Sequence, residues 1–97
     1  MIIHPEKLSG TASSGGLSVN TNSRLKGLLR QVVIKPTTNP TYNFKIENED
    51  SLTIFCEESI TGEYANEVVI PVTNTCTFIV ENSTRDELFT IHLVVQE

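Results

Sequence analysis

Two histidines, two cysteines and a pair of adjacent serines are the side chains of this sequence that most often take part in catalysis. His4 and His92 lie 88 positions apart, so no HxH or HxxxH spacing places two metal ligands side by side. Ser13 and Ser14 precede two glycines, but no histidine base or orienting acid is grouped with them. We therefore expect a protein that is not an enzyme, with no catalytic residue, no metal and no cofactor.

A glycine-rich segment at residues 10–16 has the glycine gap of a phosphate-binding loop. Such a loop needs a lysine after its second glycine and a helix behind it. Leu17 stands where the lysine is required, and no helical pattern follows. We therefore discard nucleotide binding at this segment.

Acidic side chains gather at residues 47–50 and again at Glu57 and Glu58. Carboxylate oxygens are ligands for Ca²⁺, but neither segment has the ordered spacing of an EF-hand loop. Paired carboxylates also hydrolyse glycosides, which requires two acids facing each other across a cleft. We interpret both segments as solvated loops and leave open whether the first of them binds Ca²⁺.

The two cysteines, Cys56 and Cys76, are too few for a disulfide framework and too far apart for a CxxC motif. Each lies in a strand-like run and in phase with apolar neighbours. This pattern predicts two reduced, buried thiols. A disulfide between them stays open, because it requires that their two strands face each other.

The composition points to one small β domain. The chain has 97 residues and no Trp, and Val and Ile are plentiful, which favours pleated strands over helices. No apolar run reaches the roughly 18 residues of a membrane span. The first residues lack the pattern of a secretory signal, so we expect assembly in a cytoplasm.

Six strands follow from alternating or β-branched runs separated by turn residues, and one or two more are expected within residues 1–23. Between residues 41 and 47, for example, Tyr42, Phe44 and Ile46 share one face and polar residues the other. Together the runs predict an all-β, antiparallel two-sheet sandwich, either Ig-like or jelly-roll-like. The predicted strands cover residues 25–35, 41–47, 52–57, 67–72, 76–81 and 87–95.

The first 23 residues are rich in Ser, Gly, Thr and Asn and are interpreted as an N-terminal arm, with the sandwich domain at residues 24–97. Its own domain, a sister subunit or another protein must hold such an arm. The domain core should fold without residues 1–16. The candidate anchors of the arm are its large apolar residues, Ile2, Ile3, Leu17 and Val19.

Some apolar side chains are left over for the outer faces of the predicted sheets, where a contiguous group would mark an interface. The interface candidates are Phe55, Ile79, His92 and Val94. Tyr42, Phe55 and Tyr64 could instead offer stacking surfaces to a sugar. The run at residues 67–72 ends near Pro71 and suits an edge strand, which could pair with a peptide.

Charge divides unevenly along the chain. Residues 1–46 carry six Lys or Arg against one acid, whereas residues 47–97 carry eleven acids against one Arg. The sequence pI of about 4.9 argues against a nucleic-acid partner, which calls for a concentrated basic face. The uneven division is compatible either with an ordinary solvated surface or with complementary faces that meet between subunits.

Several segments together resemble a known class of protein. After the Ser/Gly/Thr-rich arm come residues 28–36 (LLRQVVIKP), 41–47 (TYNFKIE), 76–84 (CTFIVENST) and 86–91 (DELFTI). Their order and style resemble the small β-sandwich accessory proteins of tailed-bacteriophage virions, such as capsid decoration or cement proteins. The resemblance covers residues 17–97 and contains no diagnostic motif.

The resemblance implies a structural virion protein that docks on a phage particle and stabilises it. Its partners would be itself, as a trimer or other ring, and a major capsid or tail protein, with no nucleic acid and no membrane. It would be located in the virion after assembly in the host cytoplasm, and head or tail stays open. The alternative is a small carbohydrate- or receptor-binding β-domain of a fibre or tail adhesion module.

Overall fold

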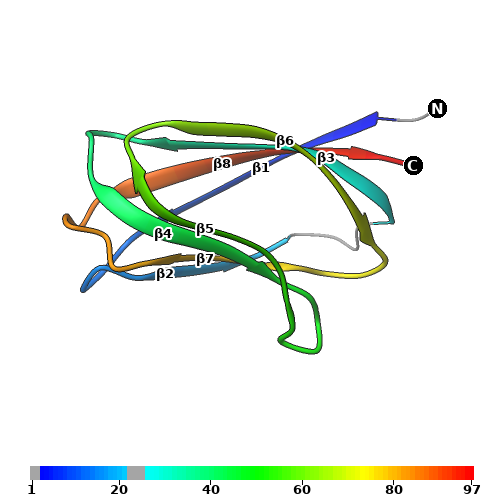
Figure 1. Ribbon diagram of the computed structural model, residues 1–97, viewed down its shortest axis with the longest axis horizontal. Helices are drawn as coiled ribbons and strands as arrows, with labels where there is room; N and C mark the ends of the chain where they lie inside the picture. Colours follow the sequence, from blue (N-terminus) through cyan, green and yellow to red (C-terminus); the bar gives the residue numbers. More distant parts are fainter. Residues whose placement is uncertain (1–2, 22–25) are drawn as a thin grey trace.

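The computed structural model describes residues 3–21 and 26–97, with the backbone alone at His4. Within them, eight strands and no helices form two four-stranded antiparallel sheets that pack face to face (Figure 1). Sheet I has the strand order β1-β8-β3-β6, and sheet II the order β2-β7-β4-β5. The strands are β1 (Ile3–Thr11), β2 (Leu17–Asn20), β3 (Gly27–Pro36), β4 (Thr41–Glu47), β5 (Thr53–Thr61), β6 (Tyr64–Val72), β7 (Thr77–Glu81) and β8 (Leu88–Gln96).

The pairing follows one rule along the chain. The first strand pairs with the last, the second with the seventh, the third with the sixth and the fourth with the fifth. This is the pattern of a long double ribbon of strands rolled up on itself, which is the jelly-roll arrangement. The predicted two-sheet antiparallel sandwich is confirmed, and of its two topologies the structure has the jelly roll.

The core lies between the sheets and follows the alternation seen in the sequence. Tyr42, Phe44 and Ile46 of β4 are buried, as are the inward residues of β8. The ring of Phe44 stacks on Phe78 of β7 at 6.2 Å, and Tyr42 meets Phe89 edge to face at 5.0 Å. Because both sheets contribute branched and aromatic side chains, the interior closes without tryptophan.

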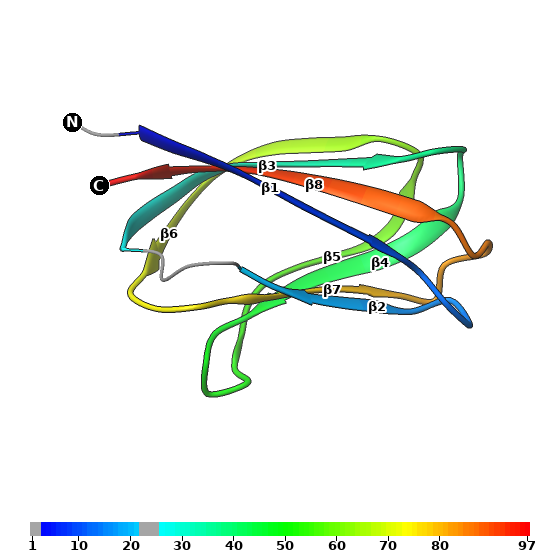
Figure 2. The same ribbon diagram turned by 180° about the vertical axis from the view of Figure 1, so that it is seen from behind.

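The predicted arm is held by its own domain. β1 runs beside β8 over nine residues, and β2 runs beside β7, as Figure 2 shows from behind. Leu8 and Ala12 belong to the buried core. The segment therefore forms one edge strand of each sheet, and the boundary proposed between residues 23 and 24 lies outside the described residues.

The largest difference from the predicted strands concerns residues 58–66. We interpreted them as a polar loop, but most of them extend β5 and β6, which turn around Gly62 (φ +71°). The hydroxyl of Tyr42 donates to the carbonyl of Gly62 at 2.8 Å and fixes this turn to the core. The strand with Pro71 is β6, which is an edge of sheet I as its proline suggested.

Candidate functional site

The four arm anchors separate in the structure. Leu17 and Val19 on β2 point inward and pack against the core, so their role is internal. Ile3 lies on β1 with 56% of its surface exposed. Ile2 lies outside the described residues.

The four interface candidates also divide between faces. His92 and Val94 of β8 are half-buried and alternate with the core residues Ile91, Leu93 and Val95, so they face outward from sheet I. Ile79 of β7 lies opposite Lys45 and faces outward from sheet II. These three candidates are therefore split between opposite sides of the molecule.

Phe55 does not lie on an outer face. An extra residue in β5 shifts the β4–β5 register between Ile46 and Glu47, so that Phe55 lies opposite the buried Ile46. Its ring centre lies 6.2 Å from that of Phe44. Such a bulge reverses which residues point inward. For the same reason Cys56 lies opposite the outward-facing Lys45 and is exposed, so the prediction that it is buried is wrong.

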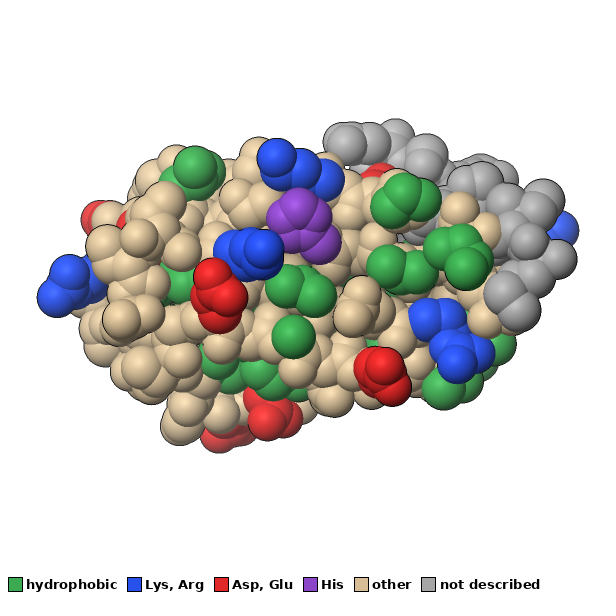
Figure 3. All heavy atoms as spheres, turned by 90° about the horizontal axis from the view of Figure 1, so that it is seen from above, with side chains coloured by type: hydrophobic (Ala, Val, Ile, Leu, Met, Phe, Trp, Pro, Cys, Tyr) green, Lys and Arg blue, Asp and Glu red, His purple; other side chains and the backbone are tan. Residues whose placement is uncertain are grey.

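The outward side chains of sheet I, which we call the sheet I face, form rows across its four strands. One row runs from Lys7 through His92 and Val33 to Ala65. Directly opposed residues of an antiparallel pair project to the same side, so these side chains are neighbours. Figure 3 looks onto this face and shows hydrophobic and basic side chains interspersed around a histidine.

A second row runs from Pro5 through Val94 and Gln31 to Glu67. Beside it, Ile3, Arg30, Val94 and Gln96 line an open hollow of about 360 Å³. Arg30 Nη1 donates to Gln96 Oε1 at 3.1 Å, which holds the guanidinium along one wall of the hollow. The face thus combines branched apolar side chains with three basic ones, Lys7, Arg30 and Lys35, and with the acidic Glu67 at its edge, in a protein that is acidic as a whole.

Arg30 reaches this position through a bulge in β3. In the pairing of β3 with β8, Leu29 and Gln31 lie opposite the consecutive residues Val95 and Val94, so that Arg30 is the extra residue on β3. On the other side of β3 the extra residue lies on β6, because Leu29 and Gln31 lie opposite Ile70 and Glu67. A bulge turns a side chain away from the regular alternation. Arg30, Lys7 and Val33 are not among the predicted interface residues, because nothing in the sequence shows which strands are neighbours.

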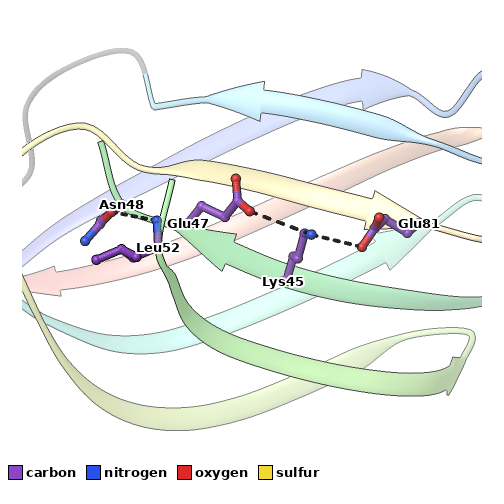
Figure 4. A network of polar contacts seen from close by, with 5 residues as sticks. All are labelled: Lys45, Glu47, Asn48, Leu52 and Glu81. Carbon is purple, nitrogen blue, oxygen red and sulfur yellow. Dashed lines mark hydrogen bonds and ion pairs between the residues drawn. The ribbon is translucent and has the colours of Figure 1, made fainter. Parts of the chain in front are cut away.

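The outer face of sheet II has a different character. Lys45 of β4 lies between two carboxylates, with Nζ 3.4 Å from Glu81 and 3.7 Å from Glu47 (Figure 4). The hydrogen bond and charge of Glu81, together with Glu47, raise the pKa of Lys45. Exposed pairs of this kind contribute little to stability, but they neutralise the basic group. Lys45 therefore gives this face no net positive charge.

The acidic turn at residues 47–50 is organised by the side-chain amide of Asn48. Asn48 Oδ1 accepts hydrogen bonds from the backbone N–H groups of Asp50 and Leu52, at 2.9 and 3.0 Å, which is an Asx-type turn. Glu49 accepts a hydrogen bond from the side-chain amide of Asn74. Among residues 3–21 and 26–97, no group of three His, Cys, Asp or Glu side chains is placed to hold a metal ion.

Next to this turn, a pocket of about 130 Å³ lies between the β4–β5 and β6–β7 connections, lined by Glu49, Ile54, Pro71, Asn74 and the buried Cys76 among others. Burial and the nearby Glu6 charge raise the pKa of the Cys76 thiol, which keeps it protonated and unreactive. Both cysteines are free, which rules out the disulfide left open above.

No helix in the described part of the chain has the length and apolar character to cross a membrane.

Comparison with known proteins gives fold relationships only. No protein-family profile matches the chain, and no curated protein matches it in sequence. Its fold is similar to that of FlhE (TM-score 0.57, 10% identity, 98% of each chain covered). It is also similar to the Yersinia pseudotuberculosis-derived mitogen YPM (TM-score 0.57, 11% identity, 99% of this chain and 89% of that chain).

A third similar structure is Aeromonas hydrophila PliG, a periplasmic lysozyme inhibitor of g-type lysozyme (TM-score 0.56, 11% identity, 96% of this chain and 87% of that chain). The resemblance to accessory proteins of tailed-phage virions is therefore wrong. The strand style that suggested it belongs to β-sandwiches in general, and the structural similarity is to FlhE, YPM and PliG. The chain is an all-β, two-sheet antiparallel sandwich that these proteins resemble in fold and not in sequence.

Proposed function

We propose that this chain is a non-enzymatic binding domain that recognises a protein receptor through the sheet I face. The observation that carries the proposal is the arrangement of Val33 and Val94 between His92, Lys7 and Arg30, beside an open hollow. Apolar centres with polar surroundings and an arginine are typical of protein interfaces. The basic side chains favour a receptor surface with apolar groups and carboxylates.

Two observations are compatible with this role, one on the similar structures and one on the sandwich itself. One is described as an inhibitor of an enzyme and another as a mitogen, and neither description names a catalytic activity. The sandwich also places the outward side chains of four strands on one firm surface, which lowers the entropy cost of binding.

Carbohydrate binding has less support. Of the three aromatic residues expected to stack on sugars, Tyr42 is buried and Phe55 packs against the core. Tyr64 is half-buried on β6 and packs against the core as well. A sugar platform needs an exposed aromatic ring face, which the sheet I face lacks among the described residues.

The test compares two matched substitutions on opposite faces. Val94→Glu changes the sheet I face, whereas Ile79→Glu places the same charge on the outer face of sheet II. Biotinylated wild-type chain and both variants are applied to an array of receptor ectodomains and to a glycan array. Circular dichroism checks that each variant is folded.

We expect the wild type and Ile79→Glu to bind the same receptor and Val94→Glu to bind it at least about tenfold more weakly. A receptor that binds all three forms equally would contradict the assignment to the sheet I face. Binding to glycans alone would replace the proposal by the carbohydrate-binding alternative.

A further inference from the structure

Sheet I ends in two edge strands, β1 on one side and β6 on the other. Among the described strands, none pairs with the outer edge of either, so each edge presents a row of backbone N–H and C=O groups. Such an edge is a template for another strand. On β6, Val69 is 66% exposed, which is unusual for a large apolar residue in the middle of a strand.

The two edges match each other in length and direction. Both strands have nine residues. Every neighbouring pair in sheet I is antiparallel, so β1 and β6, three strands apart, run in opposite directions. A second copy shifted sideways within the plane of the sheet therefore brings its β1 beside β6 in the antiparallel sense of the rest of the sheet.

The charges of the two edges are also complementary. Lys7 projects from β1 on the sheet I face, and Glu67 projects from β6 on the same face, since their rows are adjacent. When the rows continue from one copy into the next, Lys7 lies diagonally across from Glu67, within reach of a long side chain. A pairing of β6 with β6 would offer no such opposite charge at this row, because each edge would contribute Glu67.

A proline near the end of each edge strand limits where the pairing can form. Pro5 on β1 and Pro71 on β6 lie in adjacent rows at the same end of sheet I. Each lacks a backbone N–H, so pairing there is weakened on both strands. A shift of the second copy by two residues along the strands brings the stretches without a proline together, so that residues 7–10 of β1 lie opposite residues 64–67 of β6 and Lys7 lies directly opposite Glu67.

We propose that copies of this chain associate edge to edge, β1 of one copy pairing with β6 of the next, so that sheet I continues from one molecule into its neighbour. The contact is heterologous, because two different edges meet. Repeated contacts of this type close into a ring or extend as a filament, and do not end at a two-fold dimer. This association leaves Val33, His92, Val94 and Arg30 of the sheet I face uncovered and does not rest on the receptor binding proposed above, although Lys7 belongs to both surfaces.

The experiment measures the solution mass of the full chain by sedimentation and light scattering, up to about 1 mM protein and at low and high salt. Lys7→Glu and Glu67→Lys each reverse one charge of the contact. The matched control is Lys35→Glu, which reverses a charge on the same face but on the central strand β3. Thermal unfolding checks that all variants fold alike.

We expect the wild type and Lys35→Glu to associate with rising concentration, and each edge variant to associate about tenfold more weakly. The double variant, or an equimolar mixture of the two edge variants, should regain association, because each mixture contact again joins opposite charges. A wild type that stays monomeric throughout overturns the proposal. Association that Lys7→Glu leaves unchanged, or that the charge swap does not restore, overturns it as well.

Discussion

Glu87 accepts hydrogen bonds from both the backbone N–H and the hydroxyl of Thr38, at 2.8 and 2.6 Å, although the two residues lie 49 positions apart. The hydroxyl of Thr37 donates to the same carboxylate at 3.0 Å. These bonds fasten the β3–β4 connection to the start of β8. Burial acts to raise the pKa of Glu87, but the hydrogen bonds from Thr38 and Thr37 outweigh it and lower the pKa.

A carboxylate with a lowered pKa stabilises the fold above the pKa of the unfolded chain, and that contribution is lost as the pH falls through the folded pKa. We therefore expect the free energy of unfolding to fall as the pH drops below about 4.5. Glu87→Gln should lower it at neutral pH by roughly 1–2 kcal/mol and reduce its dependence on acid pH. Urea unfolding at about pH 7 and about pH 4 measures both effects.

Glu58→Gln is the control for that experiment, because Glu58 lies exposed on the edge strand β5. It should change the free energy of unfolding by less than about 0.5 kcal/mol. If the free energy of unfolding of Glu87→Gln depends on acid pH as strongly as that of the wild type, other carboxylates cause the dependence.

Deleting residues 1–12 should destabilise the whole domain. The deletion removes β1 from beside β8 and takes Leu8 and Ala12 out of the core. We expect the free energy of unfolding to fall by about 3 kcal/mol or more. Urea unfolding monitored by circular dichroism measures this loss. Ser9→Ala, an exposed change on the same strand, should have almost no effect. A truncated chain as stable as the full chain would restore the idea of a removable arm.

The two thiols should differ in reactivity. Cys56 is exposed, whereas Cys76 is 4% exposed and its pKa is raised by burial. A thiol reagent such as DTNB should therefore modify one cysteine of the native chain promptly and the second only after denaturant is added. Cys56→Ser should abolish the prompt reaction and Cys76→Ser should leave it intact. Equal rates for both thiols would contradict the assigned burial.

Gly27 is required at the start of β3. Its φ of +130° is disfavoured for other residues, and an added Cβ would lie 2.1 Å from the carbonyl oxygen of Gln96. Gly27→Ala should lower the free energy of unfolding by about 2–3 kcal/mol, as thermal or urea unfolding would show. In Gly16→Ala the nearest atom, the carbonyl oxygen of Val80, lies 3.8 Å away, so that variant should be much closer to the wild type.

Most of the strands could be predicted from local pattern. The alternation through Tyr42, Phe44 and Ile46 identified that strand and its inward face. It succeeded because the pleat of a strand places every second side chain on the same side. It failed at Phe55 and Cys56, where one extra residue in β5 reverses the alternation and only the partner strand reveals it.

The amino-acid sequence by itself determined that the chain forms a β-sandwich with an aliphatic and aromatic core, since both follow from residue type and spacing. Only the tertiary structure decided that Lys7, His92 and Val33 lie in one row, and that β1 and β6 are the edges of one sheet. The physical reason is that strand pairing joins residues up to about 90 positions apart. The energy of that pairing depends on how both sheets close around a shared core, which local patterns do not record.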